Sequence, residues 1–272
     1  MRGKILIFGK GFIGNRIREY LKCDISGRRI FSYRDAQKEI KRFKPDVIIN
    51  CIGHTGRNVD DCEKDIDKTL LANTFVPVIL AEAALRNNIR FVHISSGCIY
   101  HYDYHKDHPV PESKAPDFFD LFYSRSKIYA EEALDVLSQA YPILILRLRI
   151  PLDGRPHPRN ILTKLLKYKK IIDIPNSITY LPDFLKALKH LIKIRANGIY
   201  NIANKGKLRY PELLEAYKKY MPRCKYETTD NAGLRLLRTN LLLSGRKLSN
   251  SGFLMPNIHE VLEECVQEYL KY

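Results

Sequence analysis

Short apolar runs alternate with amphipathic segments along the first half of the chain. Four runs have the composition of strands buried on both faces, at 4–8, 45–53, 89–96 and 142–150. Apolar side chains also recur at helical spacing in two segments, 76–88 and 130–140. This alternation predicts an α/β fold with a doubly wound parallel sheet, and it places functional residues at the carboxyl ends of the strands.

Three glycines follow the first apolar run as "GKGFIG", and a helical pattern follows them. In this G-x-G-x-x-G spacing, Gly9 permits a tight turn, Gly11 lets the backbone approach a pyrophosphate, and Gly14 lets the helix pack close to the strand. Backbone N–H groups of the first helical turn, at Phe12 and Ile13, would then hold the phosphates. The pattern predicts a Rossmann-type unit that binds a dinucleotide.

The segment "CDISGRRIF", about 20 residues further on, bears on which dinucleotide is bound. An acidic residue in this region binds a ribose hydroxyl in many such folds, and Asp24 is a candidate. Arg28 and Arg29, however, lie where a second strand should end, and guanidinium groups suit a 2′-phosphate in charge and bidentate geometry. We therefore expect NADPH rather than NADH. The alternative is that both arginines are solvated loop residues.

The character of the sequence changes after Pro151, where "PLDGRPHPRN" is rich in turn residues. We expect an NADP(H)-binding Rossmann domain over 1–150. The remainder, 151–272, mixes short helices with a strand at 198–204 and is expected to form mainly a substrate-binding lobe. Part of 176–203 is expected to pack back on the Rossmann domain.

Net charge and cysteine spacing narrow the classes of partner. The chain has 272 residues and a net charge of +16, but its basic residues are dispersed. The densest group, "KLLKYKK" at 164–170, has the spacing of a solvated helix face and lacks the interleaved aromatic residues of a nucleic-acid surface. The six cysteines show no disulfide or metal-ligand spacing, so we expect reduced thiols and no metal site.

No purely apolar stretch approaches the roughly 20 residues of a transmembrane helix. The N-terminal apolar run is also too short for the core of a signal peptide. We therefore expect a cytoplasmic protein with no membrane or nucleic-acid partner.

Tyr123 and Lys127 are four residues apart at the start of a predicted helix, so they share a face. An ammonium group next to a phenol stabilises the phenolate and lowers the phenol pKa from its usual value near 10. Tyr123 could then donate a proton to a carbonyl oxygen while hydride reaches the carbon. Ser96, at a strand end, is placed to hold the same oxygen.

With this set, the chain resembles the extended short-chain dehydrogenase/reductase family. It is most similar to the nucleotide-sugar branch of dTDP-4-dehydrorhamnose reductases and bifunctional UDP-4-keto-6-deoxyglucose 3,5-epimerase/4-reductases. The segments that carry the resemblance are "TGRNVDDCE" (55–63), "SSGCIYHYD" (95–103), "YSRSK" (123–127), "LRLRIPL" (146–152), "PRNILTK" (158–164) and "IPNSIT" (174–179). The resemblance implies Ser96, Tyr123 and Lys127 as the reductase set and a UDP- or dTDP-linked sugar as substrate. Family habit suggests a homodimer.

The resemblance also implies an epimerase pair, Cys98 and Lys164. Protons next to a keto group are acidic, and epimerisation needs a base and an acid on opposite faces of the ring. A thiol, with a usual pKa near 8.5, is suited to this exchange. The alternative for Cys98 is a small buried hydrophobic side chain. Further residues match the family's cofactor and substrate contacts: Cys51, Gly53 and Asn73 for the cofactor, and Thr55, Asn160, Asn176 and Arg238 for the substrate.

Three functions remain open at this point. The first is an NADPH-dependent 3,5-epimerase and 4-reductase acting on a nucleotide-linked 4-keto-6-deoxyhexose. The second is a 4-reductase without epimerase activity, which would leave Cys98 and Lys164 without a role. The third is a non-catalytic NADP-binding regulatory subunit, which an intact Ser96, Tyr123 and Lys127 set disfavours.

Overall fold

A computed structural model of the chain describes residues 3–230, 233 and 237–272. The chain divides into two compact units. The first comprises residues up to Ile99, Pro116–Arg147 and Leu188–Tyr200. The second comprises Tyr100–Ala115, Leu148–Ala187 and the residues from Asn201 onward.

A six-stranded sheet forms the core of the first unit, with strand order β2-β1-β3-β4-β5-β9. The pairs β1–β2, β1–β3 and β3–β4 are parallel. The strand order reverses beside β1, which creates a topological switch point between β1 and β3. The predicted doubly wound sheet is confirmed. The strands are β1 (Ile5–Phe8), β2 (Asp24–Ser26), β3 (Val47–Asn50), β4 (Arg90–Ser96), β5 (Ile143–Leu148) and β9 (Gly198–Ile202).

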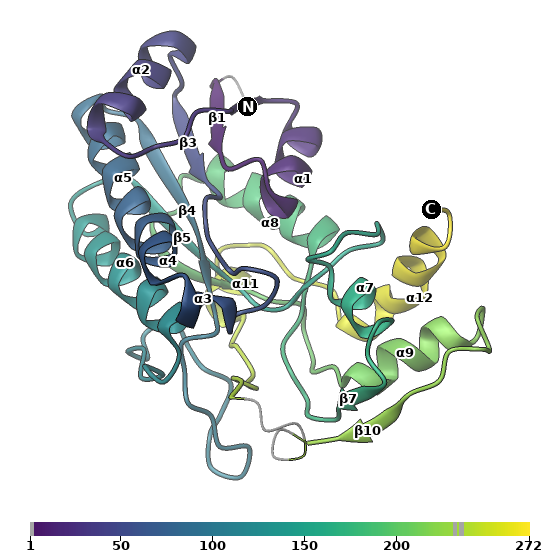
Figure 1. Cartoon of the computed structure of the whole chain (residues 1–272). Helices are drawn as coiled ribbons and strands as arrows, with labels where there is room; N and C mark the ends of the chain where they lie inside the picture. The colour runs from purple at the N-terminus through teal and green to yellow at the C-terminus, as the bar shows by residue number, and fades with distance from the viewer. Residues whose placement is uncertain (1–2, 231–232, 234–236) are drawn as a thin grey trace. The chain divides into compact units, whose positions relative to one another are not determined.

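Helices cover both faces of this sheet (Figure 1). α2, α5 and α6 share one apolar cluster with the strands, in which Leu6, Phe91 and Ile145 are fully buried. On the other face lie α1 and the end of α8, where Lys189 contacts the ring of Tyr20. The helices of this unit are α1 (Phe12–Leu21), α2 (Tyr33–Phe43), α3 (Asp61–Lys64), α4 (Ile66–Leu70), the π-helical turn η1 (Leu71–Phe75), α5 (Val76–Arg86) and α6 (Phe122–Ser138), with α8 (Leu181–Lys193) shared between the units.

The continuous helical stretch Ile66–Arg86 is long and apolar enough, by length and composition alone, to span a membrane. Sequence reasoning missed it because polar residues such as Asn73 interrupt the apolar run without ending the helix. Half of its most apolar window is buried inside the protein, and α5 packs against β3, β4 and α6. A core helix of this kind meets the same criterion, so its place in the fold explains its composition.

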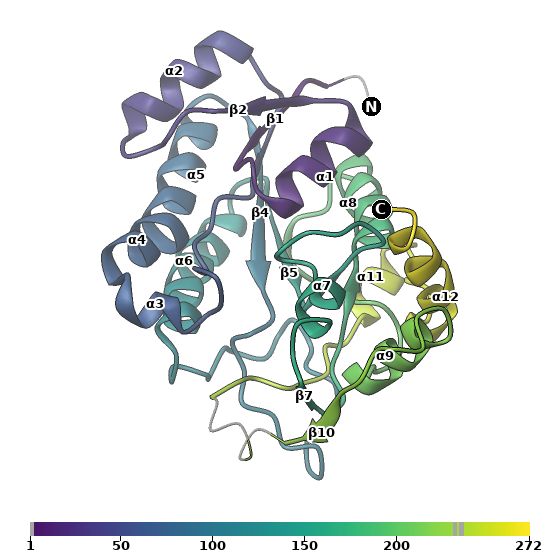
Figure 2. The ribbon, with the colours of Figure 1, turned by 45° about the vertical axis from the view of Figure 1, so that its right-hand side comes forward.

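The second unit has its own apolar core, to which Leu162, Tyr180 and Leu262 contribute. It contains two small parallel strand pairs, β6–β8 and β7–β10. Figure 2 shows α9 and α12 lying side by side in this unit, in agreement with their contacts. Its elements are β6 (Pro151–Leu152), α7 (Ile161–Leu165), β7 (Lys170–Ile172), β8 (Thr179–Tyr180), α9 (Tyr210–Lys218), β10 (Glu227–Thr229), α11 (Arg246–Asn250) and α12 (Ile258–Tyr269).

β9 lies within the range 176–203 that was expected in part to pack back on the Rossmann domain, and it joins the main sheet. Two other sequence expectations need adjustment. Residues 100–115, expected in the Rossmann domain, belong to the second unit. There Val110 forms a bridge to Leu243. The lysine-rich segment 164–170 is not one helix face: α7 ends at Leu165, and Lys170 begins a strand that pairs with Glu227.

Candidate active site

The turn between β1 and α1 forms a close-packed glycine loop. Gly9 has φ of +104°, and a Cβ there would lie 2.6 Å from the carbonyl carbon of Cys51, so this position requires glycine. A Cβ on Gly14 would lie 1.9 Å from the Gly9 oxygen, so the helix sits directly on the turn. A Cβ on Gly11 would meet nothing within 4 Å. The two packing glycines and the one open glycine match the roles expected from their spacing.

The start of α1 suits the phosphates of a dinucleotide. Gly11 is the N-cap residue and has no side chain to bond the first-turn amides. Phe12 and Ile13 begin the helix immediately beyond it. Because the first N–H groups of a helix have no intrahelical acceptor, this end is suited to an anion.

The loop after β2 gathers cationic side chains at the same edge of the sheet. Phe8 pairs with Ser26, so the residues that follow each strand come together. The Lys10 ammonium lies against Gly27, where a Cβ would be 2.7 Å from its Nζ. The Arg28 Nε donates to Glu39 Oε1 at 3.1 Å.

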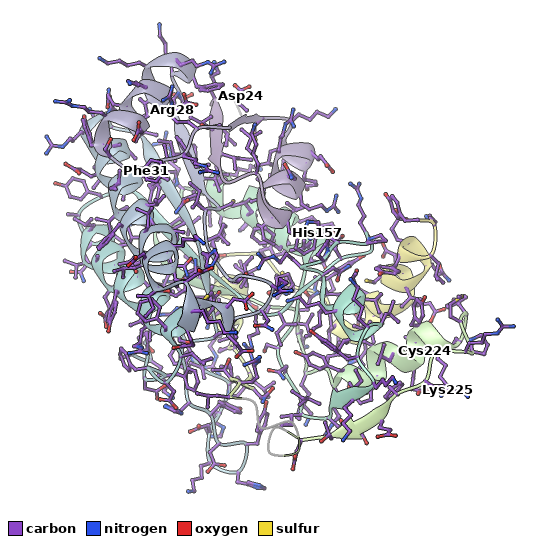
Figure 3. The ribbon with its side chains drawn as sticks, in the orientation of Figure 1. Asp24, Arg28, Phe31, His157, Cys224 and Lys225 are labelled. Carbon is purple, nitrogen blue, oxygen red and sulfur yellow. The ribbon has the colours of Figure 1, made fainter. Side chains whose placement is uncertain are left out.

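The hydrogen bond to Glu39 fixes the position of the Arg28 side chain. Glu39 is buried and also accepts a hydrogen bond of 2.6 Å from the Ser26 hydroxyl. The Arg28 side chain is 40% exposed, so part of this side chain is accessible to a ligand. Asp24 begins β2, whereas Arg28 follows it, and both are labelled in Figure 3. Because Asp24 is the first residue of the edge strand β2 and pairs with Leu6, it lies away from the carboxyl ends of the strands. Arg29 is exposed.

The loop that follows β3 brings Gly53 close to Lys127 of α6. A Cβ on Gly53 would lie 3.3 Å from both Lys127 Nζ and Asn73 Oδ1, so a larger residue there would press against both side chains. Burial raises the pKa of the Cys51 thiol, which therefore stays protonated and acts as a packing group. Thr55 follows in the same loop and is half-buried.

Asn73 fixes this region through its amide. Its Oδ1 accepts from His54 N at 2.7 Å, and its Nδ2 donates to the Ser126 hydroxyl at 3.0 Å. The Ser126 hydroxyl in turn donates to the Tyr123 carbonyl at 2.7 Å. Asn73 lies in η1, and π-turns inside helices are frequent at functional sites because they redirect side chains.

Tyr123 and Lys127 lie on the inner face of α6, with exposed fractions of 8% and 5%. Burial lowers the pKa of Lys127 to about 8, and the negative charge of Glu131 partly opposes that shift. A buried ammonium one helical turn from a phenol is the arrangement that stabilises a phenolate.

The end of β4 carries Ser96 and Cys98. Cys98 N donates to the Ser96 hydroxyl at 3.1 Å, and the Ser124 hydroxyl donates to Cys98 O at 2.6 Å. The thiol-bearing residue is thus tied to β4 on one side and to the first turn of α6 on the other. Cys98 is half-exposed, whereas Cys62 and Cys265 are fully buried.

Four expected site residues belong to the second unit. Lys164, on α7, is half-buried, and burial followed by the nearby charges of Arg159 and Arg238 lowers its pKa. An amine with a lowered pKa exchanges protons more readily near neutrality. Arg238 donates to the Leu237 carbonyl at 2.7 Å.

The two asparagines of this unit use their amides within the protein. Asn160 is fully buried, caps α7 by accepting from Leu162 N at 3.2 Å, and donates to Asp153 O at 2.6 Å. Asn176 is fully buried as well and accepts from Arg149 Nη2 at 2.7 Å. Both therefore have a structural use, in which Asn160 positions the helix that carries Lys164.

Sequence reasoning missed a buried polar cluster behind the tyrosine and lysine. Glu131 is 2% exposed and accepts hydrogen bonds from Ser95 and Arg147. The signal was present, because Glu131 follows Lys127 at the same four-residue interval that separates Lys127 from Tyr123. No cluster of metal-ligating side chains occurs among the residues that the structure describes.

Comparison with known proteins agrees with this geometry. Residues 5–167 match the model of the NAD dependent epimerase/dehydratase family. The chain is 32% identical to the Arabidopsis thaliana bifunctional dTDP-4-dehydrorhamnose 3,5-epimerase/dTDP-4-dehydrorhamnose reductase, over 79% of this chain and 75% of that protein.

A second relative is longer. An Arabidopsis thaliana trifunctional UDP-glucose 4,6-dehydratase/UDP-4-keto-6-deoxy-D-glucose 3,5-epimerase/UDP-4-keto-L-rhamnose-reductase is 32% identical over 97% of this chain, which spans only 42% of its length. Among solved structures, the L780 UDP-rhamnose synthase of Acanthamoeba polyphaga mimivirus superposes with a TM-score of 0.90 at 26% identity, covering 98% of this chain and all of that one.

The glycine loop, the buried tyrosine and lysine and these matches agree with the resemblance seen in the sequence. The chain belongs to the NAD dependent epimerase/dehydratase family, which is of the extended short-chain dehydrogenase/reductase type, and the relatives reported above are named as epimerases and reductases of rhamnose synthesis.

Proposed function

We propose that this chain converts a nucleotide-linked 4-keto-6-deoxyhexose to a rhamnose-type sugar, by epimerisation at C3 and C5 followed by NADPH-dependent reduction at C4. The activities for which the relatives are named support this proposal. The observation that carries it is that Ser96, Cys98, Tyr123 and Lys127 are all held within one unit, at adjoining ends of β4 and α6. UDP and dTDP are both candidates for the nucleotide. A cytoplasmic location and a homodimer stay predictions.

Reduction rests on Tyr123, Lys127 and Ser96. The bound dinucleotide supplies the hydride that reaches C4. Tyr123 donates a proton to the C4 oxygen, and the buried ammonium of Lys127 stabilises the phenolate that remains. The Ser96 hydroxyl donates a hydrogen bond to the same oxygen, which polarises the carbonyl. Asn73, through Ser126, holds the backbone of Tyr123 in place.

Epimerisation rests on Cys98 and Lys164. Protons at C3 and C5 are acidified by the C4 carbonyl, and a thiolate can remove one without attacking the ring. We assign proton removal to Cys98 and proton return on the opposite face to Lys164, whose lowered pKa suits the transfer. If the chain were a reductase only, neither side chain would be needed.

The cation cluster after β2 supports NADPH as the cofactor. Lys10 and Arg28 flank Gly27, at the edge where the ribose attached to adenine lies in this fold. Arg28 keeps a partly exposed side chain whose guanidinium suits a 2′-phosphate. Asp24, which would favour a free ribose hydroxyl, is exposed at the start of β2 rather than in the loop that follows this strand.

The decisive experiment supplies UDP- or dTDP-4-keto-6-deoxyglucose with NADPH in deuterated water. We expect NADPH oxidation and deuterium at C3 and C5 of the product. Absence of NADPH oxidation with either substrate would contradict the proposal. Tyr123→Phe should lower reduction by about 10²-fold or more, the usual contribution of a proton donor.

Variants at cysteine separate the two activities. Cys98→Ala should abolish deuterium incorporation at C3 and C5 while leaving reduction of a pre-epimerised substrate. The matched control is Cys224→Ala, which removes another half-exposed thiol, from the second unit. Equal deuterium incorporation in both variants would remove Cys98 from the mechanism.

A further inference from the structure

Three ionisable side chains lie at four-residue intervals along the inner face of α6: Tyr123, Lys127 and Glu131. Their exposed fractions fall from 8% to 5% to 2%. Residues four apart on a helix are neighbours, so Lys127 lies between a phenol and a carboxyl group. The sequence motif covers only the first two of the three.

The third residue is bound on both of its oxygens. Glu131 Oε2 accepts from the Ser95 hydroxyl at 2.7 Å. Its Oε1 accepts from Arg147 Nε at 2.8 Å and from Arg147 Nη2. Arg147 is 1% exposed and comes from β5, while Ser95 comes from β4. Two oxygens that both accept hydrogen bonds are the pattern of a carboxylate.

The other titratable groups that influence the pKa of Lys127, which are Cys51, Cys62 and His93, are neutral. Burial raises the pKa of Cys51, and the Cys62 thiol donates to the His54 carbonyl. Burial lowers the pKa of His93, which is therefore neutral. Glu131 is thus the carboxylate among the described groups that influence Lys127.

Burial alone drives an ammonium toward its neutral form. A neutral lysine cannot stabilise a phenolate, so the proposed reductase needs a buried anion near Lys127. Arg147 also binds this anion, through Glu131 Oε1. Glu131 Oε2 accepts from the neutral Ser95 hydroxyl, and the carboxylate still acts on Lys127 one helical turn away, where its charge opposes the loss of the proton.

We propose that Glu131 is a positioning residue of the active site, whose buried carboxylate, oriented by Ser95 and Arg147, keeps Lys127 protonated beside Tyr123. This inference rests on the proposed reductase role of Tyr123 and Lys127. It adds a third member to that pair and gives Ser95 a role distinct from that of its neighbour Ser96.

The test measures Lys127 directly, without substrate. The ε-carbon resonance of Lys127 in ¹³C-lysine-labelled protein, assigned with Lys127→Arg, is titrated by NMR in the wild type and in Glu131→Gln. The amide keeps an acceptor oxygen for Arg147 and can donate to the Ser95 hydroxyl oxygen, but it loses the charge. We expect the midpoint to fall by about one pH unit or more, which lowers the protonated fraction about ten-fold on the alkaline side.

Two control variants isolate the charge. Glu132→Gln removes a carboxylate from the adjacent, exposed position on the same helix and should leave the midpoint unchanged. Ser95→Ala leaves the charge and should shift the midpoint much less than Glu131→Gln. Glu131→Asp keeps the charge but withdraws it by one methylene. It should give a smaller downward shift, and it carries the test if the glutamine variant does not fold.

Turnover provides the second readout. In Glu131→Gln, the alkaline limb of the pH profile for NADPH oxidation should move down by the same amount as the NMR midpoint. An unchanged midpoint in folded Glu131→Gln and Glu131→Asp overturns the inference. A shifted midpoint without turnover on any keto sugar would instead contradict the proposed function and leave the role of Glu131 toward Lys127 standing.

Discussion

Two substitutions in the glycine loop, Gly14→Ala and Gly11→Ala, each add one methyl group, and we expect the first to reduce stability and the second to weaken cofactor binding. In Gly14→Ala, the added Cβ would lie 1.9 Å from the Gly9 carbonyl oxygen, a backbone atom that cannot rotate away. The helix must therefore move by about 1 Å, and close-packed interiors resist such shifts. We expect a loss of about 3 kcal/mol, the upper end of the usual cost of overpacking.

In Gly11→Ala, the same methyl group enters open space. The residue has φ of −86°, which any residue adopts, so only the weaker N-cap preference of alanine counts, at less than about 1 kcal/mol. The methyl instead occupies the surface that we expect to face the pyrophosphate of the proposed cofactor. We expect NADPH to bind at least about ten-fold more weakly, equivalent to about 1.4 kcal/mol.

Thermal unfolding of the apoprotein and titration of NADPH fluorescence measure the two effects. At about 2–4 °C per kcal/mol, Gly14→Ala should lower Tm by about 6–12 °C and Gly11→Ala by no more than about 4 °C. Gly245→Ala is the matched control, because Gly245 is also an N-cap glycine with open space around it, but in the second unit. It should leave NADPH affinity unchanged. Equal losses of Tm in Gly11→Ala and Gly14→Ala would refute this reasoning.

Three further predictions concern the cofactor edge, α7 and the sheet interior. Arg28→Ala should weaken NADPH binding about ten-fold or more with little effect on NADH, measured as the ratio of the two dissociation constants; an unchanged ratio would exclude a 2′-phosphate contact. Asn160→Ala removes the N-cap of α7 and should lower the free energy of unfolding, measured in urea, by about 1 kcal/mol. If α7 positions Lys164, this variant should also slow deuterium exchange at C3 and C5 more than it slows reduction. Burial lowers the pKa of His93 in the folded state, so the unfolded state binds a proton at higher pH than the folded state does. The free energy of unfolding should therefore fall as pH drops below about 6.5, by up to about 1.4 kcal/mol per pH unit. His93→Gln should remove that part of the slope, and identical slopes in both proteins would count against a buried neutral histidine.

Much of the main sheet was predictable because β1, β3, β4 and β5 are local, buried and mostly apolar runs. The expected strand at 89–96 is β4, Arg90–Ser96, and the expected helix at 76–88 is α5, Val76–Arg86. The segment 100–115 was not predictable, because its place depends on contacts with distant residues. Asn201 donates to the Val110 carbonyl, and Val110 bridges to Leu243, and neither pairing leaves a local periodicity.

The candidate site shows the same division between local and distant information. Tyr123 and Lys127 were found because their spacing on one helix is local. Whether an asparagine side chain faces a ligand or the protein cannot be read from a motif, and the buried amide of Asn176 is bonded to Arg149 from another segment. The partnership of Glu131 with Arg147 likewise needs β5 to lie beside α6.

The late position of β9 in the sequence has a consequence for synthesis on the ribosome. β9 covers the outer side of β5, but Gly198 follows Leu148 by 50 residues. At about 5–20 residues per second, β5 remains an uncovered edge for about 3–10 s as the chain emerges. Its sequence, "ILILRL", is mostly apolar and includes two β-branched isoleucines, and an uncovered apolar edge is a template for pairing with other chains. Nascent or truncated chains that end before residue 198 are therefore the forms of this protein most exposed to aggregation.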